Sequence, residues 1–227
     1  MRRLIVTALT SFVCAIAWST PYPGGDAYIA ARDAERAGKY ADAIAGYDDC
    51  AKRDRGLAAF AHVRAVVCRA RGGDAAGAIE QLRGLAAGPD GDASALLARA
   101  ELAGLLYNQR AYAEAAELLE PIVNAPVRPR WLDPHVRVYG DSLIAQTDSK
   151  TRNAGFAVFA GMLEAARTRT QRLEAAKRLE QSPDPRQRLD AAYVYVNAGE
   201  WASADAALTA LDAALGSARA TYAVDVA

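Results

Sequence analysis

Two histidines, His62 and His135, are the side chains in this 227-residue sequence best suited to proton transfer near neutral pH. A histidine beside a serine and an aspartate would make a nucleophilic site. His62 falls within a predicted helix, where packing or exposure to solvent explains it, and His135 follows Pro134 at a predicted helix start. The sequence has no GxSxG, HExxH, phosphate-loop or dinucleotide-binding glycine motif. We therefore predict no catalytic residue and no cofactor, and a protein that is not an enzyme.

Paired carboxylates are the second candidate for acid–base chemistry. Asp48 with Asp49, and Glu117 with Glu120, have the groups that such chemistry uses. Each pair lies on a predicted amphipathic helix, so a solvated helix face is the favoured explanation. No metal site is predicted either, because the sequence has no CxxC motif and its two histidines are far apart.

The charges of the chain balance, with 27 basic and 27 acidic residues. A nucleic-acid partner is not predicted, because such binding needs a basic surface. One local exception is the stretch 167–172, RTRTQR, which together with Lys177 and Arg178 is locally basic. It would form a positive patch with Arg128, Arg130, Arg137 and Arg152. That patch would suit carboxylates of wall peptides. An ordinary charged helix face, with Glu164 and Glu174 interleaved, is the favoured alternative.

The elements that must position these residues are helices. Hydrophobic residues make up 52% of the chain, and aromatic residues only 7%. The hydrophobic residues are mostly alanine, which has the highest helix propensity and lets helices approach closely. Period-two runs of β-branched residues are missing, so we predict an all-α protein.

A helix–turn–helix pattern recurs along the chain, and its turn residues are Gly38, Gly73, Arg110 and Gly199. The spacings are 73 − 38 = 35, 110 − 73 = 37 and 199 − 110 = 89, and the last is not a whole number of repeats. Glycine can end the first helix in a left-handed conformation, whereas Arg110 should make its turn costlier. Five residues after each turn stands an alanine, and nine after stand Tyr47, Leu82, Leu119 and Leu208.

This pattern, G-x-[YW]-x-x-A-x-x-x-[YL], resembles the tetratricopeptide repeat over residues 24–57, 59–90, 96–126 and 185–215. The resemblance implies a right-handed superhelix of stacked antiparallel helical hairpins, irregular in the middle. The leading aromatic residue of each repeat is absent, and Ala27, His62, Arg99 and Arg188 stand there instead.

We predict one domain over residues 18–227, with hairpins near 24–57, 59–90, 96–126, 133–166 and 168–215. In the middle, Asp133 is the predicted N-cap of a helix with Pro134 at its first position. The prolines of Ser182-Pro-Asp-Pro185 should interrupt the helices again.

In tetratricopeptide arrays the first helices line a concave groove. Glu35 is one of the residues on these first helices that would face the groove. The resemblance assigns ligand binding to Tyr28, Arg32, Arg36, Arg71, Tyr107, Asn108, Tyr193 and Asn197. The Lys/Asn clamp that some family members use for a peptide carboxylate is not present. Tyr, Arg and Asn side chains would still suit an extended peptide.

The amino terminus predicts export. Met1-Arg2-Arg3 is basic, an apolar run follows from Leu4 to Trp18, and Ala15-Ile16-Ala17 matches a signal-peptidase site. We predict a signal peptide over residues 1–17, cleaved after Ala17, and no membrane span in the mature chain. An uncleaved membrane anchor is the alternative, and a lipoprotein with Cys14 is disfavoured by Val13 before it.

A periplasmic or secreted protein would fold in an oxidising compartment. Cys50 and Cys68 fall on helices that should touch, so a disulfide between them is one expectation. Two buried thiols acting as small hydrophobic residues are the alternative.

A looser resemblance concerns the non-catalytic helical region of soluble lytic murein transglycosylases. It rests on residues 111–123, on the proline break at 183–189, and on the stretch that follows from Asp190. The catalytic glutamate domain of that family has no counterpart here. The leading hypothesis is thus an exported, non-catalytic helical scaffold that binds a protein, a peptide or a cell-wall polymer such as peptidoglycan. The alternative is the amino-terminal helical domain of such a transglycosylase, whose catalytic domain is not in this chain.

Overall fold

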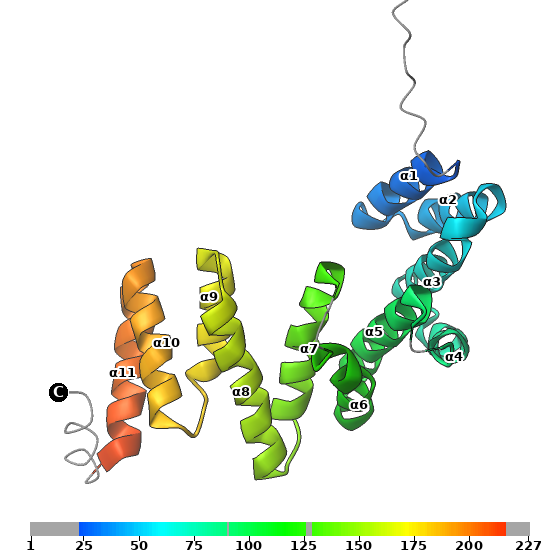
Figure 1. Ribbon diagram of the computed structural model, residues 1–227. Coiled ribbons are helices and arrows are strands. Elements are labelled where there is room, and N and C mark those ends of the chain that lie inside the picture. Colours follow the sequence, from blue (N-terminus) through cyan, green and yellow to red (C-terminus); the bar gives the residue numbers. More distant parts are fainter. Residues whose placement is uncertain (1–22, 90, 126–128, 217–227) are drawn as a thin grey trace, which may run out of the picture. The chain divides into compact units, whose positions relative to one another are not determined.

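The structure is a computed structural model that describes residues 23–89, 91–125 and 129–216. These residues form 11 α-helices and one short 3-10 helix, with no strand among them, and the all-α prediction is confirmed (Figure 1). The signal peptide predicted for residues 1–17 lies outside the described residues, and so does Cys14.

The chain divides into two compact units, Met1–Ala78 and Ile79–Ala227. Unit 1 contains α1 (Gly25–Arg36), α2 (Tyr40–Arg53) and α3 (Arg55–Arg71), and α4 (Ala75–Ala86) begins at its end and continues in unit 2. Unit 2 then contains α5 (Ala93–Asn108), α6 (Tyr112–Val123), the 3-10 helix η1 (Arg130–Leu132), α7 (Asp133–Ile144), α8 (Ser149–Ala165), α9 (Arg169–Leu179), α10 (Pro185–Ala198) and α11 (Trp201–Leu215).

The four predicted turn residues all adopt positive φ angles. The values are +73° for Gly38, +117° for Gly73, +64° for Arg110 and +74° for Gly199. Arg110 is the one non-glycine residue with a positive φ among the described residues. The left-handed conformation costs a residue with a Cβ about 1–2 kcal/mol. The predicted penalty at this turn is therefore present in the structure.

The repeated apolar positions form the cores. The alanines five residues after each turn, Ala43, Ala78, Ala115 and Ala204, are all buried. Nine residues after the turn, Tyr47, Leu82 and Leu119 are fully buried, whereas Leu208 is 44% exposed. The register thus describes the packing of the first three hairpins, and in the last hairpin it fails at Leu208 although Ala204 is buried.

Arginines fill two of the positions where a tetratricopeptide repeat has its leading aromatic residue. Arg99 donates from Nε to the carbonyl oxygen of Ala86 at 2.8 Å and from Nη2 to that of Gly88 at 2.7 Å. Arg188 donates from Nε to the carbonyl oxygen of Ser182. Carbonyl groups at helix ends lack partners within their helix. These arginines therefore tie each helix to the loop before it by hydrogen bonds instead of aromatic packing.

Side-chain caps begin several helices. Asp54, Asp92, Asp148 and Asp184 accept backbone N–H groups at the starts of α3, α5, α8 and α10, and Thr168 forms a capping box with Gln171 at α9. The prediction of Asp133 as an N-cap is wrong. The N-cap of α7 is Leu132, because η1 runs directly into α7 and gives Asp133 a helical backbone, with φ −53° and ψ −37°.

Helix α7 of unit 2 lies beside two helices that are not its neighbours in the sequence. α5 contacts α7, and α7 is joined to α9 by side chains one turn apart: Arg137 pairs with Glu174, and Asp141 with Arg178. α10 packs against α9 and α11. The row that begins with α5 therefore continues through α7 and α9, and α10 belongs to the alternate row. Figure 1 shows α7 to α11 following one another along unit 2.

The core of unit 1 holds both cysteines of the described chain. Cys50 and Cys68 are fully buried in one cluster with Ala31, Ala43 and Tyr47. The predicted proximity is confirmed, but the sulfurs are not joined in a disulfide. Burial raises the pKa of the Cys50 thiol. The thiolate is the reactive form of cysteine, so a raised pKa lowers the reactivity of Cys50.

Candidate functional site

A buried carboxylate, Glu35, lies at the centre of a polar cluster in unit 1. Glu35 is in the last turn of α1, and its side chain is only 3% exposed. Tyr47 reaches it from α2, and Arg64 and Arg71 reach it from α3. Because Arg64 and Arg71 are seven residues apart, they lie on the same face of their helix. We call these four residues the Glu35 cluster.

Both oxygens of Glu35 accept hydrogen bonds. The Tyr47 hydroxyl donates to Oε2 at 2.8 Å, and Nε of Arg64 donates to the same oxygen at 3.2 Å. Nη1 of Arg71 donates to Oε1 at 2.7 Å, and Nη2 of Arg64 donates to Oε1 as well. A buried charge is costly unless it is paired and hydrogen-bonded. Glu35 on α1 meets that condition because donors from α2 and α3 satisfy both of its oxygens.

Two tyrosines lie beside Glu35, Tyr47 fully buried and Tyr28 partly buried. Burial raises the pKa of Tyr47, and the hydrogen bond to the Glu35 carboxylate raises it further. Burial also raises the pKa of Tyr28, while the positive charge of Arg64 acts in the opposite direction. The Tyr28 ring packs edge-on against Tyr47, with ring centroids 5.2 Å apart. Tyr28 therefore forms one apolar side of the cluster.

The cluster carries more positive than negative charge. Arg64 and Arg71 together exceed Glu35 by one charge, and Arg32 is exposed on α1 one turn before Glu35. Arg71 reaches Glu35 through Nη1 only, and its side chain is 44% exposed. Its Nε and Nη2 groups therefore offer a planar pair of donors to a ligand.

Unit 1 thus contains four of the eight predicted ligand-binding residues, and they differ in their surroundings. Arg71 is a member of the Glu35 cluster, and Tyr28 packs against it through Tyr47. Arg32 is exposed on the same helix as Glu35. Arg36 instead forms an exposed pair with Asp33 at 3.5 Å, outside the cluster. The predicted set omits Arg64, whose signal in the sequence is its spacing of two helical turns from Arg71.

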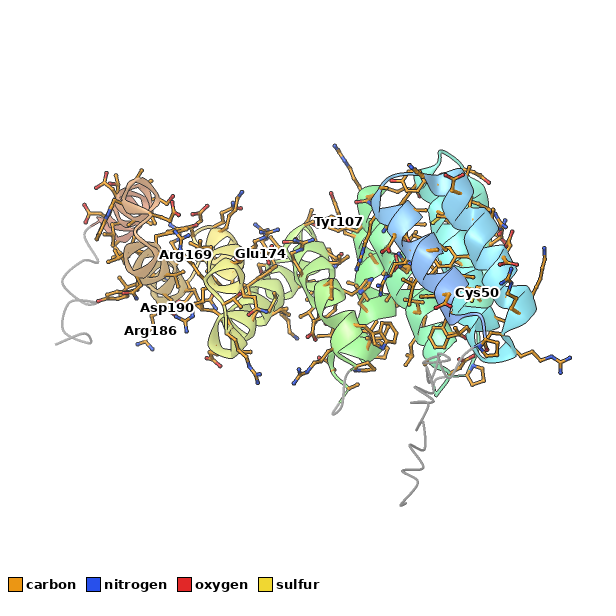
Figure 2. All side chains as sticks on the ribbon, turned by 90° about the horizontal axis from the view of Figure 1, so that it is seen from above. Cys50, Tyr107, Arg169, Glu174, Arg186 and Asp190 are labelled. Atoms are coloured by element: carbon orange, nitrogen blue, oxygen red, sulfur yellow. The ribbon has the colours of Figure 1, made fainter. Side chains whose placement is uncertain are left out.

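In unit 2, Tyr107 near the end of α5 lies beside Tyr112, with ring centroids 5.5 Å apart (Tyr107 is labelled in Figure 2). Burial raises the pKa of Tyr107, and the nearby charge of Asp141 adds to this rise. Asp141 of α7 binds Arg178 of α9 through both carboxylate oxygens, each at 3.1 Å. The Arg178 guanidinium also lies 5.6 Å from the centre of the Phe159 ring. Asn108, which follows Tyr107, is exposed.

A cavity of about 430 Å³ lies where α7, the end of α8 and the start of α9 meet. Val136, Met162 and Ala165 give it an apolar lining. Arg137 and Glu174 stand at the same cavity, 3.5 Å apart, and both are nearly half exposed (Glu174 is labelled in Figure 2). Its mixed lining suits an apolar side chain next to a polar group.

Tyr193 and Asn197 are exposed on α10. Since α9, not α10, stands beside α7, these two residues are not on the row of helices that carries Tyr107. The sequence assigned α10 to that row because its turn at Gly199 resembles the earlier turns. Residues of α9 such as Glu174 and Arg178 stand beside α7 instead.

Several arginines of the predicted positive patch bind acceptors within unit 2. Besides the pairs of Arg137 and Arg178, Arg169 donates to the carbonyl oxygen of Ala198 at 2.8 Å and to Glu200 at 2.7 Å. These pairs favour the alternative of charged helix faces over a concentrated patch. Arg128 lies outside the described residues.

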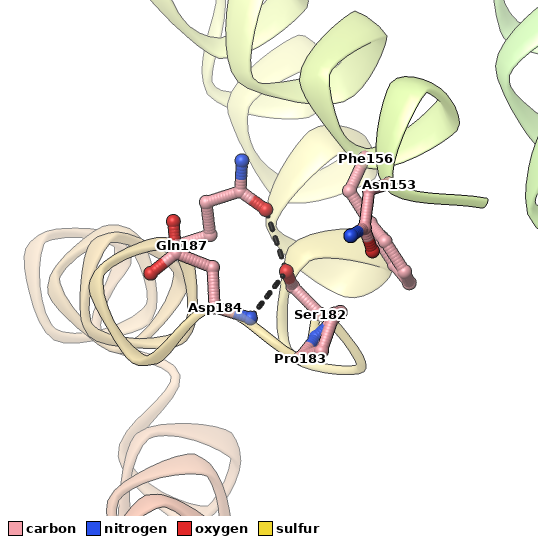
Figure 3. A pocket seen from close by; sticks show the side chains of 6 residues that line it. All are labelled: Asn153, Phe156, Ser182, Pro183, Asp184 and Gln187. Carbon is pink, nitrogen blue, oxygen red and sulfur yellow. Dashed lines mark hydrogen bonds between the residues drawn. The ribbon is translucent and has the colours of Figure 1, made fainter. Parts of the chain in front are cut away.

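A second cavity, of about 310 Å³, lies at the predicted break between α9 and α10 (Figure 3). The buried Ser182 hydroxyl donates to Oε1 of Gln187 at 2.6 Å and accepts from the Asp184 N–H at 3.1 Å. An activated serine would donate to a basic group such as histidine. Ser182 therefore ties the loop to α10 and is not placed as a nucleophile.

The candidate residues for other chemistry are dispersed. His62 is exposed on α3 of unit 1, and His135 is half-buried on α7 of unit 2. Among residues 23–89, 91–125 and 129–216, no three or more His, Cys, Asp and Glu side chains gather as a metal ion would require. In the same ranges, no helix combines the length and hydropathy of a bilayer span.

Comparisons with models of protein families, with curated proteins and with solved structures gave no match for this chain. A function for the protein therefore has to be inferred from the geometry within its two units.

Proposed function

We propose that this protein is a non-catalytic helical-repeat scaffold, exported to the cell envelope, that binds acidic segments of a protein, a peptide or a cell-wall polymer. The Glu35 cluster is the observation that supports this function best. It holds an exposed arginine, Arg71, on a buried carboxylate that a second arginine shares, with an excess of one positive charge. Arg–carboxylate pairs of this planar kind give both affinity and orientation.

Glu35 acts in this proposal as a positioning residue. By holding Nη1 of Arg71, it fixes the direction of the remaining donors before a ligand arrives. A side chain that is already ordered loses less conformational entropy on binding. Arg32 and Arg64 lie near the Tyr28 ring, so the cluster also has positive charge beside an aromatic side chain.

The test compares a fluorescent oligo-glutamate peptide with an oligo-glutamine peptide of the same length, by fluorescence anisotropy. We expect binding of the acidic peptide only, weakened by salt because exposed charges are screened. Arg71→Gln should raise the Kd about tenfold, as expected for the loss of about 1.4 kcal/mol. Arg36→Gln is the matched control, because Arg36 lies outside the cluster. Equal binding of both peptides, or equal losses in both variants, would contradict the proposal.

A second measurement addresses catalysis. The purified chain should leave a suspension of murein turbid, because the Ser182 hydroxyl donates to Gln187 and not to a histidine. Clearing of the suspension by this chain alone would show that it is an enzyme.

A further inference from the structure

An ion pair of unit 2, between Arg137 of α7 and Glu174 of α9, is only loosely joined. Nη1 of Arg137 lies 3.5 Å from Oε1 of Glu174, and the two side chains are 45% and 43% exposed. Within the described part of the chain, neither charged group has another hydrogen bond or ion pair. Nε and Nη2 of Arg137 and Oε2 of Glu174 can therefore bind a ligand.

A ligand can enter this pair at little cost. An exposed ion pair contributes only about 0–1 kcal/mol, so the two groups can exchange each other for ligand groups. One turn further along the same helices, Asp141 and Arg178 are joined more firmly. Both oxygens of Asp141 accept from Arg178 at 3.1 Å, and these side chains are less exposed. The open end of this ladder of charges is thus the Arg137–Glu174 pair.

The loose pair stands at the cavity of about 430 Å³ between α7, α8 and α9. Val136 of α7 and Met162 of α8 supply apolar surface there, and Val136 is buried. The thioether side chain of methionine is flexible and adapts to the shape of what it contacts. The cavity therefore combines an apolar side with a donor group and an acceptor group that are next to each other.

The other polar residues of the lining already have partners. Oε1 of Gln171 accepts the backbone N–H groups of Arg167 at 3.0 Å and of Thr168 at 3.2 Å, in the capping box that begins α9. Asp133 also has an interaction partner. The open positions that the structure establishes in this cavity are therefore those of Arg137 and Glu174.

We propose that this cavity binds a free α-amino acid with an aliphatic or thioether side chain. The carboxylate and the ammonium group of such a molecule are attached to one carbon atom, so they need neighbouring partners of opposite charge. The Nε–Nη2 edge of Arg137 binds the carboxylate, and Oε2 of Glu174 accepts from the ammonium group. The side chain of the ligand then lies against Val136 and Met162.

Other classes of ligand match only one half of the pair. A simple anion is attracted by Arg137 and repelled by Glu174, and a simple cation is attracted and repelled in the opposite way. The interior of a peptide carries neither charge on its main chain, and each end of a peptide carries only one of them. A zwitterion satisfies both groups, and its lack of net charge leaves the balance of the cavity unchanged.

Isothermal titration calorimetry of the full chain with L-leucine, up to millimolar concentrations, tests the proposal. Three derivatives of leucine separate the contributions of its charges. N-acetyl-leucine lacks the positive charge, leucine amide lacks the negative charge, and N-acetyl-leucine amide lacks both. Each should bind at least tenfold more weakly than leucine. Free serine, which has both charges but no apolar side chain, should also bind at least tenfold more weakly.

Variants of the lining assign the binding to this cavity. Arg137→Gln and Glu174→Gln should each raise the Kd for leucine at least tenfold, because each removes one of the two charges. Ala165→Phe should do the same, because the ring takes up apolar space in the cavity. Glu200→Gln is the matched control, since it breaks an exposed ion pair of unit 2 that is not part of the lining. Circular dichroism checks that the variants stay folded, which their exposed positions favour.

Equal affinity for leucine and N-acetyl-leucine amide would assign the cavity to an apolar side chain alone and overturn the proposal. Equal affinity for leucine and serine would overturn it as well, and so would a lack of binding heat with leucine at two temperatures. This site is independent of the proposed function, which rests on unit 1. Arg71→Gln should leave leucine binding unchanged, and Glu174→Gln should leave oligo-glutamate binding unchanged, so the two proposals fail separately.

Discussion

Glu35 illustrates how a single carboxylate organises unit 1. Its two oxygens connect α1 to Tyr47 of α2 and to two arginines of α3. A buried ion pair adds little stability relative to apolar packing, but removing one partner leaves the others with unpaired charge or donors. The cluster therefore makes the packing of α1 on α3 specific, and it exposes one side of Arg71.

Replacing Glu35 by alanine should destabilise the protein by about 3–5 kcal/mol, the cost of breaking a buried charged pair from one side. The Tyr47 hydroxyl would lose its acceptor, and two guanidinium groups would face each other without a carboxylate. The free energy of unfolding in urea measures this. Asp33→Ala, which breaks an exposed pair on the same helix, should cost less than about 1 kcal/mol. Similar losses in both variants would mean that the cluster has no special role.

Alkaline pH should destabilise the fold through its buried tyrosines. The pKa values of Tyr47 and Tyr195 are raised, by burial first and then by hydrogen bonds to Glu35 and Glu180. In the unfolded chain tyrosine loses its proton near pH 10, while the folded protein keeps it. The native state then binds more protons, so stability is intact below about pH 10 and falls as the pH rises above it.

Unfolding free energies measured from about pH 9 to pH 11 test this expectation. Tyr47→Phe should unfold with a smaller loss of stability over that range than the wild type, even if its stability at pH 9 is lower. An identical slope in the variant would show that Tyr47 ionises equally well in the folded protein.

At the scale of single residues, the sequence identified Arg71 and Tyr28 but not their connection. Arg71 and Glu35 are 36 residues apart, and they meet only because α1 and α3 both pack against α2. The sequence near an arginine does not show whether its side chain will pair with a buried carboxylate or face water. Pairing between distant residues of this kind therefore has no local sequence signal.

At the scale of elements, the turns carry the clearest local signal. Three glycines and Arg110 adopt positive φ, and the sequence predicted both the turns and the cost at Arg110. A glycine has no Cβ to clash in this conformation, so a glycine between two predicted helices indicates a positive φ at the turn.

Arg110→Gly should therefore stabilise the protein by about 1 kcal/mol, because it removes the strain of a left-handed arginine. Urea unfolding of unit 2 measures the change. Gln109→Gly is the matched control: Gln109 has a φ of −83°, so the same substitution one residue earlier has no strain to relieve. If Gln109→Gly stabilises equally, positive φ is not the cause.

The irregular spacing of 89 residues between Arg110 and Gly199 also has an explanation at this scale. α9 takes the place beside α7 that the repeat pattern assigned to α10. At about 35 residues per repeat, 89 residues correspond to about two and a half repeats. The last glycine turn thus joins helices in the opposite phase, which accounts for the exposure of Leu208 on α11.

At the scale of the molecule, each unit has a core of its own. Unit 1 packs Tyr47, Cys50 and Cys68 together, and unit 2 packs Phe159 and Leu179 with the small residues of α9 to α11. Alanine dominates both cores, so the few large side chains contribute much of the buried apolar area.

Tyr47→Ala should cost about 3–5 kcal/mol, because the ring is fully buried and its loss leaves a cavity between α1, α2 and α3. Hydrogen exchange of the α1–α3 amides, compared with those of α8–α11, localises the loss to unit 1. Tyr193→Ala, at an exposed tyrosine, is the control and should change little. A cost below about 1 kcal/mol for Tyr47→Ala would contradict the packing register.

The sequence by itself determined the helices, their glycine turns and the buried alanine positions, because these follow from propensity and from side-chain period within one helix. The export signal and the family resemblance stay predictions. Only the tertiary structure decided that Glu35 joins Arg64 and Arg71, that Cys50 and Cys68 share one buried cluster with Tyr47, and that α9 stands beside α7. Each of these depends on which helices meet, and that is decided by packing between residues far apart in the chain.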